Sequence, residues 1–211
     1  MPTTPIAREA EQLCREMADR WLRDHCYRTF AFGALLGRRL PCRWDAFFIA
    51  SMLHDIGLTA PTEEGMDQRI SGYPLRSAPC FAVRGAGVAR GLATKHDWRA
   101  ARRDALADAI SVHVNVRVTR HQGIEAHLLN AGSALDVVGF RLHRLAPETV
   151  RSVEDEWPRG HSFRDEMWRV WLREAEAHPE CRGRLLNIWG SFRRRIYRSR
   201  PKGWDDFTGP S

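Results

Sequence analysis

Residues 51–59 read Ser51-Met52-Leu53-His54-Asp55-Ile56-Gly57-Leu58-Thr59 and follow directly on the apolar run 46–50. The run indicates a helix that faces the core, and the glycine indicates where that helix stops. Buried polar groups need partners, so an imidazole beside a carboxylate at such a helix end must be compensated. A divalent metal ion is the simplest compensation. Neighbouring side chains on a helix point about 100° apart, so His54 and Asp55 can both reach an ion beside the helix end.

Two further segments place a polar residue in apolar surroundings. His25 opens an amphipathic segment upstream, and Asp136 is the one acid in the small and apolar stretch Ala131–Gly139 downstream. An acid among apolar residues is costly unless it is paired, with either an ion or an arginine. Taken alone, His25 is also explained as an exposed histidine at a helix start. The order His, His-Asp, Asp gives these residues one shared explanation.

This order and its flanking residues resemble the HD-domain superfamily of metal-dependent hydrolases, and within it the cyanamide hydratase-like branch. The resemblance covers roughly residues 20–142, with a weaker echo at 158–186. Five ordered motifs carry it, namely His25-x-x-Arg28, Leu53–Thr59, Phe81–Ala86, Ala109–His113 and Gly132–Gly139.

The resemblance implies that His25, His54, Asp55 and Asp136 ligate one divalent transition metal. Two nitrogen and two oxygen ligands suit Zn²⁺ or Fe²⁺, with Mn²⁺ as a further option, better than a metal that prefers thiolates. On a five- or six-coordinate ion, four protein ligands leave room for water, whose pKa falls from about 15.7 toward roughly 7 on binding. The expected function is addition of this activated water to a small, cyanamide-like nitrogenous substrate, which gives a urea-type product.

His113 ends the apolar helical stretch that begins at Ala109. A single histidine in such a place is also explained as a satisfied core residue. The resemblance implies that it faces the metal pocket, where it could hydrogen-bond the substrate or shuttle a proton. We therefore predict His113 and Asp55 as catalytic residues. Thr59 and Arg28 are pocket residues by motif position, although Arg28 could equally hold a carboxylate ligand or lie on an exposed helix face.

Departures from the family pattern leave the substrate open. Ala82 stands where relatives commonly carry an acid, and Val114–Val118 lacks the usual small and proline-rich continuation. Another nitrogenous or natural-product substrate is therefore an alternative. A nucleotide phosphohydrolase is a second one, although Leu58 occupies the place of a water-activating acid and no dense Lys/Arg phosphate cradle lies near the motifs.

A mixed-valent di-iron oxygenase is a third alternative, because such enzymes use the order His, His-Asp, His, His, Asp. His96 and His113 can mimic the two additional histidines. His96, however, lies in a polar stretch between two predicted helices, where a solvated histidine is the simpler expectation. Metal analysis would separate the two classes, because the oxygenase would contain two irons per chain and the hydrolase one ion.

The 211 residues suffice for one substantial core and are too few for two comfortable domains. We find helical periodicity, no alternating strand pattern and no internal repeat, which predicts an all-α single domain. It comprises an HD core at about 20–142, a C-terminal helical extension at about 143–200 and a short tail at 201–211. Helices are expected over 5–21, 23–39, 43–56, 81–94, 100–116, 124–138, 147–157, 162–172 and 180–197, with a long irregular loop, suited to a lid, at 58–80.

The net charge of +7 invites a nucleic-acid interpretation. Eight basic residues and no acid lie between Arg182 and Lys202, so the rest of the chain is close to neutral. With Tyr197 and Trp204, this arginine-rich segment could grip phosphates and stack on bases. It is equally explained as a solvated helix end whose arginines complement the helix dipole.

No apolar run approaches the roughly 20 residues that span a bilayer, and the N-terminus lacks the apolar core of a signal peptide. The partner we expect is a small-molecule substrate, rather than a membrane or nucleic acid, and the Trp-rich C-terminal helices leave a homo-oligomer open. Five scattered cysteines without a Cys-x-x-Cys pair favour reduced thiols in a cytoplasmic protein. They are Cys14, Cys26, Cys42, Cys80 and Cys181.

Overall fold

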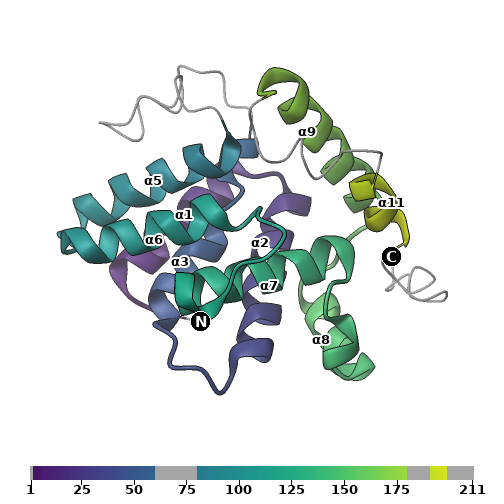
Figure 1. Cartoon of the computed structure of the whole chain (residues 1–211), viewed down its shortest axis with the longest axis horizontal. Helices are drawn as coiled ribbons and strands as arrows, with labels where there is room; N and C mark the ends of the chain where they lie inside the picture. Colours follow the sequence, from purple (N-terminus) through teal and green to yellow (C-terminus); the bar gives the residue numbers. More distant parts are fainter. Residues whose placement is uncertain (1, 60–79, 180–190, 199–211) are drawn as a thin grey trace.

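The computed structural model describes residues 2–59, 80–179 and 191–198 (Figure 1). Throughout these segments the chain forms helices joined by turns, without a strand, which confirms the all-α prediction. The α-helices are α1 Pro5–Met17, α2 Arg20–Gly37, α3 Trp44–Leu53, α5 Phe81–Lys95, α6 Ala100–Val112, α7 Ile124–Val138, α8 Pro147–Glu156, α9 Phe163–Ala177 and α11 Ser191–Arg198. Short 3₁₀ turns are η1 Ile56–Leu58, η3 Arg120–Gln122 and η4 Leu142–Arg144.

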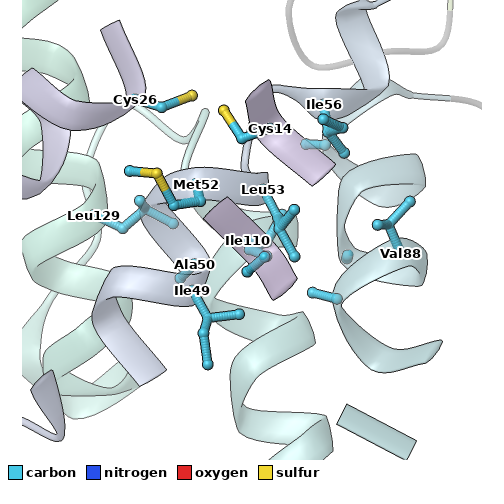
Figure 2. Close-up of a cluster of buried hydrophobic side chains, with 14 of the residues drawn as sticks. Cys14, Cys26, Ile49, Ala50, Met52, Leu53, Ile56, Val88, Ile110 and Leu129 are labelled. Atoms are coloured by element: carbon cyan, nitrogen blue, oxygen red, sulfur yellow. The ribbon is translucent and has the colours of Figure 1, made fainter. Parts of the chain in front are cut away.

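Helix α3 is the centre of the molecule. Every residue from Ala46 to Leu53 is buried, as expected of a helix that is apolar on all sides. It packs against α1, α2, α5, α6 and α7, and its Ile49, Met52 and Leu53 lie in the main hydrophobic cluster (Figure 2). The His54-Asp55 pair at its end is therefore delivered into the interior.

Helices α2 and α7 pack along one another more extensively than any other pair among the described elements. The approach is close because Gly132 has no side chain, and a methyl group there would lie 2.2 Å from the Thr29 carbonyl oxygen. Thr29 is one turn after His25, and Gly132 is about one turn before Asp136. The glycine contact therefore brings the histidine of α2 and the acid of α7 together.

Helix α5 packs closely on the end of α3. A methyl group on Gly85 would lie 2.7 Å from the Leu53 carbonyl oxygen and 3.0 Å from that of His54. Neighbouring Ala82 is fully buried. The motif around residues 81–86 thus serves to seat α5 against the backbone of the His-Asp turn.

The C-terminal helices join the same hydrophobic core. Phe163 and Trp171 of α9 and Ile196 of α11 belong to the cluster that α3 centres. The Trp157 ring, just after α8, stacks on Tyr27 of α2 with centroids 5.5 Å apart. The segment that follows the motif-bearing region therefore packs directly on α2.

Several helix boundaries differ from the sequence expectations, and α9 continues five residues past the expected end at Leu172. The first predicted helix breaks at extended Ala18, so that Trp21 belongs to α2. Helix α3 ends at Leu53, three residues early, and α6 ends at Val112 with His113 as its cap. Of the predicted loop 58–80, residues 60–79 lie outside the described segments, as do 180–190 of the last predicted helix.

Within the described segments, no helix has the length and apolarity to cross a membrane. Cys14, Cys26 and Cys42 are free thiols. Cys80, in contrast, is disulfide-bonded. The expectation of reduced thiols is therefore wrong for Cys80, because spacing along the sequence does not reveal which cysteines the fold brings together.

Candidate metal centre

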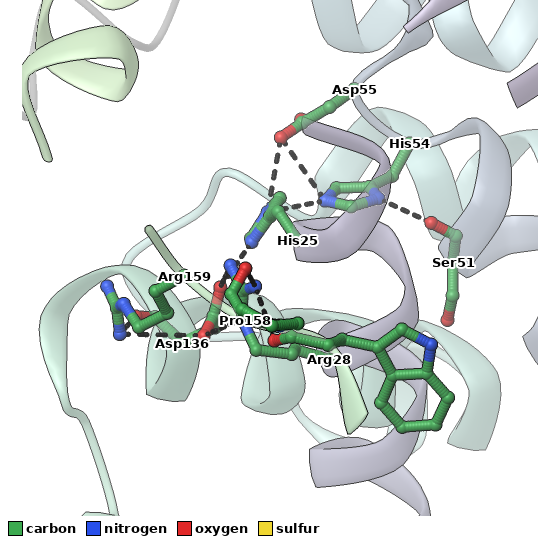
Figure 3. Close-up of polar contacts among 9 residues, drawn as sticks. His25, Arg28, Ser51, His54, Asp55, Asp136, Pro158 and Arg159 are labelled. Atoms are coloured by element: carbon green, nitrogen blue, oxygen red, sulfur yellow. Dashed lines mark hydrogen bonds and ion pairs between the residues drawn. The ribbon is translucent and has the colours of Figure 1, made fainter. Parts of the chain in front are cut away.

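Three polar side chains meet at the end of α3. His25 comes from the first half of α2, His54 caps α3, and Asp55 begins the turn into η1 with φ −108° and ψ 7°. The Nε2 atoms of the two histidines lie 3.2 Å apart, and Asp55 Oδ2 lies 3.3 Å from each of them (Figure 3). Departure from helical geometry at Asp55 turns its carboxylate back toward both rings.

Both imidazoles are held through their other nitrogen. His54 Nδ1 lies 2.9 Å from the Ser51 carbonyl oxygen, and His25 Nδ1 lies 2.7 Å from Asp136 Oδ2. These partners can only accept a hydrogen bond, so each Nδ1 carries the proton and donates it. In the neutral rings, each Nε2 therefore directs a lone pair toward the space between the three side chains. The Asp55 carboxylate oxygen directs further lone pairs into the same space.

The donor set and its spacing fit a metal ion. Within the described residues, His25, His54 and Asp55 form a group whose ligand atoms lie close enough to hold one. A point equidistant from the three atoms lies about 1.9 Å from each, near the roughly 2.0 to 2.2 Å of zinc–nitrogen and zinc–oxygen bonds. All three residues are buried, so no bulk water screens their mutual repulsion.

His113 lies on the other side of the Asp55 carboxylate. Its Nε2 is 3.2 Å from Asp55 Oδ1, whereas its Nδ1 donates to the Ile110 carbonyl oxygen at 2.6 Å. Its ring meets that of His54 edge to face, with centroids 4.9 Å apart. Asp55 thus has one oxygen toward the predicted ligand histidines and one toward the predicted catalytic histidine.

Asp136 lies beside the group rather than within it. Its Oδ2 accepts from His25 Nδ1, and Arg28 donates to both carboxylate oxygens, at 2.8 Å from Nε and 3.0 Å from Nη2. Arg159 donates to the Asp136 backbone carbonyl at 2.6 Å. The sequence prediction that Asp136 is a ligand stays a prediction, and the arginine pair that competes with it is present.

Burial and charge act on these groups in opposite directions. Burial would raise the pKa of Asp55, but neighbouring His54 and the surrounding imidazoles hold it well below its usual value. Burial would also raise the pKa of Asp136, but Arg28 holds it well below the usual value. Burial lowers the pKa of His54, and it would lower that of His25 as well, but the hydrogen bonds to the two carboxylates raise it instead.

The structure separates the remaining sequence candidates. Arg28 is fully buried and binds the Asp136 carboxylate, so it does not lie on an exposed helix face. Thr59 Oγ1 donates to the Ile56 carbonyl oxygen of its own turn. His96 Nε2 lies 2.8 Å from Glu9 Oε2, so it pairs with α1 instead of joining the metal-ligand group.

Sequence reasoning missed two residues that border the site. Arg159 reaches Asp136 from the segment between α8 and α9, and the Phe163 ring lies 5.8 Å from the His25 ring, between centroids. The weak resemblance around residues 158–186 was the only signal there. It did not single out either residue.

No model of a protein family matches the sequence, and no curated protein matches it. The resemblance to the HD-domain superfamily therefore stays a prediction that the sequence motifs carry. The all-α fold and the His25-His54-Asp55 group stand independently of it.

Proposed function

We propose that the protein is a metal-dependent hydrolase or hydratase of the HD-domain type, which adds water to a small nitrogenous substrate such as cyanamide. His25, His54 and Asp55 would hold the ion, and Zn²⁺ or Fe²⁺ suits these ligands best. One observation carries the proposal. Two imidazole nitrogens and a carboxylate oxygen face one another within 3.3 Å in the interior.

The residues around the centre divide the work of hydration. When bound, a divalent ion lowers the pKa of water and so supplies a nucleophile at neutral pH. His113 Nδ1 donates to a backbone carbonyl, so Nε2 can accept the proton that water loses and pass it to the substrate nitrogen on which negative charge develops. A fixed donor aimed at that atom stabilises the transition state. The Asp55 carboxylate orients this donor through Oδ1. The water oxygen is thus bonded to carbon, and the protons end on nitrogen.

The surroundings favour a small substrate over a nucleotide. His25 and His54 are fully buried, and His113 is nearly so. Two arginines beside the centre, Arg28 and Arg159, bind Asp136 and backbone carbonyls. A triphosphate needs cationic side chains directed at the substrate, and these two are already engaged.

Purified protein should be analysed for metal and assayed for urea formation from cyanamide, with His54→Ala as the inactive control. We expect one transition metal per chain in the wild type, and loss of both metal and turnover in the variant. Phosphate release from a panel of deoxynucleotides would favour the phosphohydrolase alternative. Two irons per chain would favour the di-iron oxygenase, and metal without cyanamide turnover would keep the site and reject this substrate.

A further inference from the structure

We infer that Asp136 is a positioning residue for His25 and not a ligand, and that Arg28 and Arg159 clamp it for this purpose. The inference rests on the proposed metal centre, whose ligands Asp136 would support from outside. It also assigns the segment between α8 and α9, which supplies Arg159, to the metal site.

The orientation of His25 is the first observation. The Asp136 carboxylate contacts this ring at Nδ1, at 2.7 Å, whereas Nε2 faces His54 and Asp55 (Figure 3). The two ring nitrogens of imidazole point in divergent directions. An acid that accepts the Nδ1 proton therefore lies on the far side of the ring from an ion bound at Nε2.

The second observation is that both oxygens of Asp136 are already engaged. Arg28 donates to Oδ1 and Oδ2 in a two-pronged, fully buried pair, which is the strong geometry for this interaction. Arg159 adds a hydrogen bond to the Asp136 backbone carbonyl and lies 3.5 Å from Oδ1. To ligate an ion bound at His25 Nε2, the carboxylate would have to move around the ring and give up its hydrogen bond with Nδ1.

The clamp is itself held by the C-terminal segment. Arg28 Nη1 donates to the carbonyl oxygens of Trp157 and Pro158, at 3.0 and 3.1 Å. The guanidinium groups of Arg28 and Arg159 lie 5.0 and 4.3 Å from the centroid of the Phe163 ring. Residues 157–163 therefore close the Asp136 side of the site.

A carboxylate on the outer nitrogen of a metal-binding histidine fixes which nitrogen is protonated and how the ring is turned, and losing it typically weakens metal binding about 10- to 100-fold. Asp136 meets this description through one hydrogen bond. The arginines keep it ionised and fixed in place, so the ring of His25 is oriented before an ion arrives.

Co²⁺ titration tests this role, because its visible absorption bands report the ligand set and its binding isotherm reports affinity. In Asp136→Ala we expect the wild-type band positions with about 10- to 100-fold weaker binding, and in Asp136→Asn, whose amide oxygen still accepts from Nδ1, partial recovery of affinity. In Arg159→Gln we expect unchanged bands and weaker binding. Arg169→Gln, which removes an exposed arginine paired with Glu166 on α9, is the matched control and should bind as the wild type does.

A change of band positions in Asp136→Ala, with the wild type binding Co²⁺ normally, would show that Asp136 is a ligand and overturn the inference alone. Wild-type affinity in Arg159→Gln would show that Arg159 does not hold Asp136 in place. If circular dichroism shows that Asp136→Ala is unfolded, the band positions of Asp136→Asn decide whether Asp136 is a ligand. A wild-type protein that binds no Co²⁺ would overturn the proposed function and this role with it.

Discussion

His25 and His54 face one another through Nε2 atoms 3.2 Å apart, although both rings place their Nδ1 protons elsewhere. Neutral imidazoles in this arrangement have no proton to share between them, and the nearby Asp55 oxygen is an acceptor as well. The buried centre is compensated by a cation or by protonation of a ring. We therefore expect the stability of the protein to respond to metal.

Removing metal should therefore destabilise the protein. An ion that binds only the folded state adds about 2.7 kcal/mol when its free concentration is 100 times Kd, which corresponds to roughly 5–10 °C in Tm for a chain of this size. We expect calorimetry to show this rise when Zn²⁺ or Fe²⁺ is added to chelator-treated protein. His54→Ala should show no rise, and a comparable rise in that variant would mean that the ion binds elsewhere.

Replacing His113 should separate catalysis from metal binding. In His113→Gln we expect metal content to stay at the wild-type level and kcat to fall about 10²- to 10⁴-fold, the usual contribution of a general acid or base. His127→Gln is a matched control, because His127 Nδ1 also donates to a backbone carbonyl, that of Val118, at 2.7 Å. Loss of metal in His113→Gln would instead identify His113 as a ligand.

Gly132→Ala should lower stability and weaken metal binding, although Gly132 does not belong to the metal-ligand group. The added methyl group would meet the Thr29 carbonyl oxygen at 2.2 Å, and a backbone oxygen cannot rotate away. Overpacking typically costs about 1–3 kcal/mol, against about 1 kcal/mol gained from alanine in a helix. We expect a lower midpoint in urea and weaker metal binding, because α2 and α7 must separate. An unchanged midpoint would show that the contact is easily relieved.

Glu125 should make stability depend on pH. Burial would raise its pKa, but hydrogen bonds from Arg43 hold it below the usual value. A folded pKa below the unfolded value means that the unfolded chain binds more protons, so this stabilisation is complete above the unfolded value of about 4.5 and is lost as pH falls through the folded pKa.

Glu125→Gln should therefore cost stability at pH 7, and the difference from the wild type should vanish at low pH. We expect only about 1 kcal/mol, because the Arg43 side chain is half exposed. Urea titrations at both pH values measure it. Glu148→Gln, an exposed glutamate on α8, is the control. A cost that persists unchanged below the folded pKa would assign the effect to packing.

The candidate site was predictable only in part. An apolar stretch that ends in His54 and Asp55 indicates a buried helix with a polar end, and α3 confirms it. For α6, the same kind of pattern predicted a helix to residue 116, but the helix ends at Val112, because an apolar sequence can continue past the cap at His113. Arg159 could not be found, because it approaches Asp136 from a turn that has no periodicity to mark it.

The sequence by itself determined the helices, the burial of α3 and the polar residues that would need compensation in its surroundings. The spacing of apolar residues and their hydrophobicity are local properties, so the sequence alone reveals them. Only the tertiary structure decided that His25 turns Nε2 inward and that Asp136 pairs with Arg28. The partner of a buried charge depends on how closely distant helices approach, and here that distance is set where Gly132 meets Thr29.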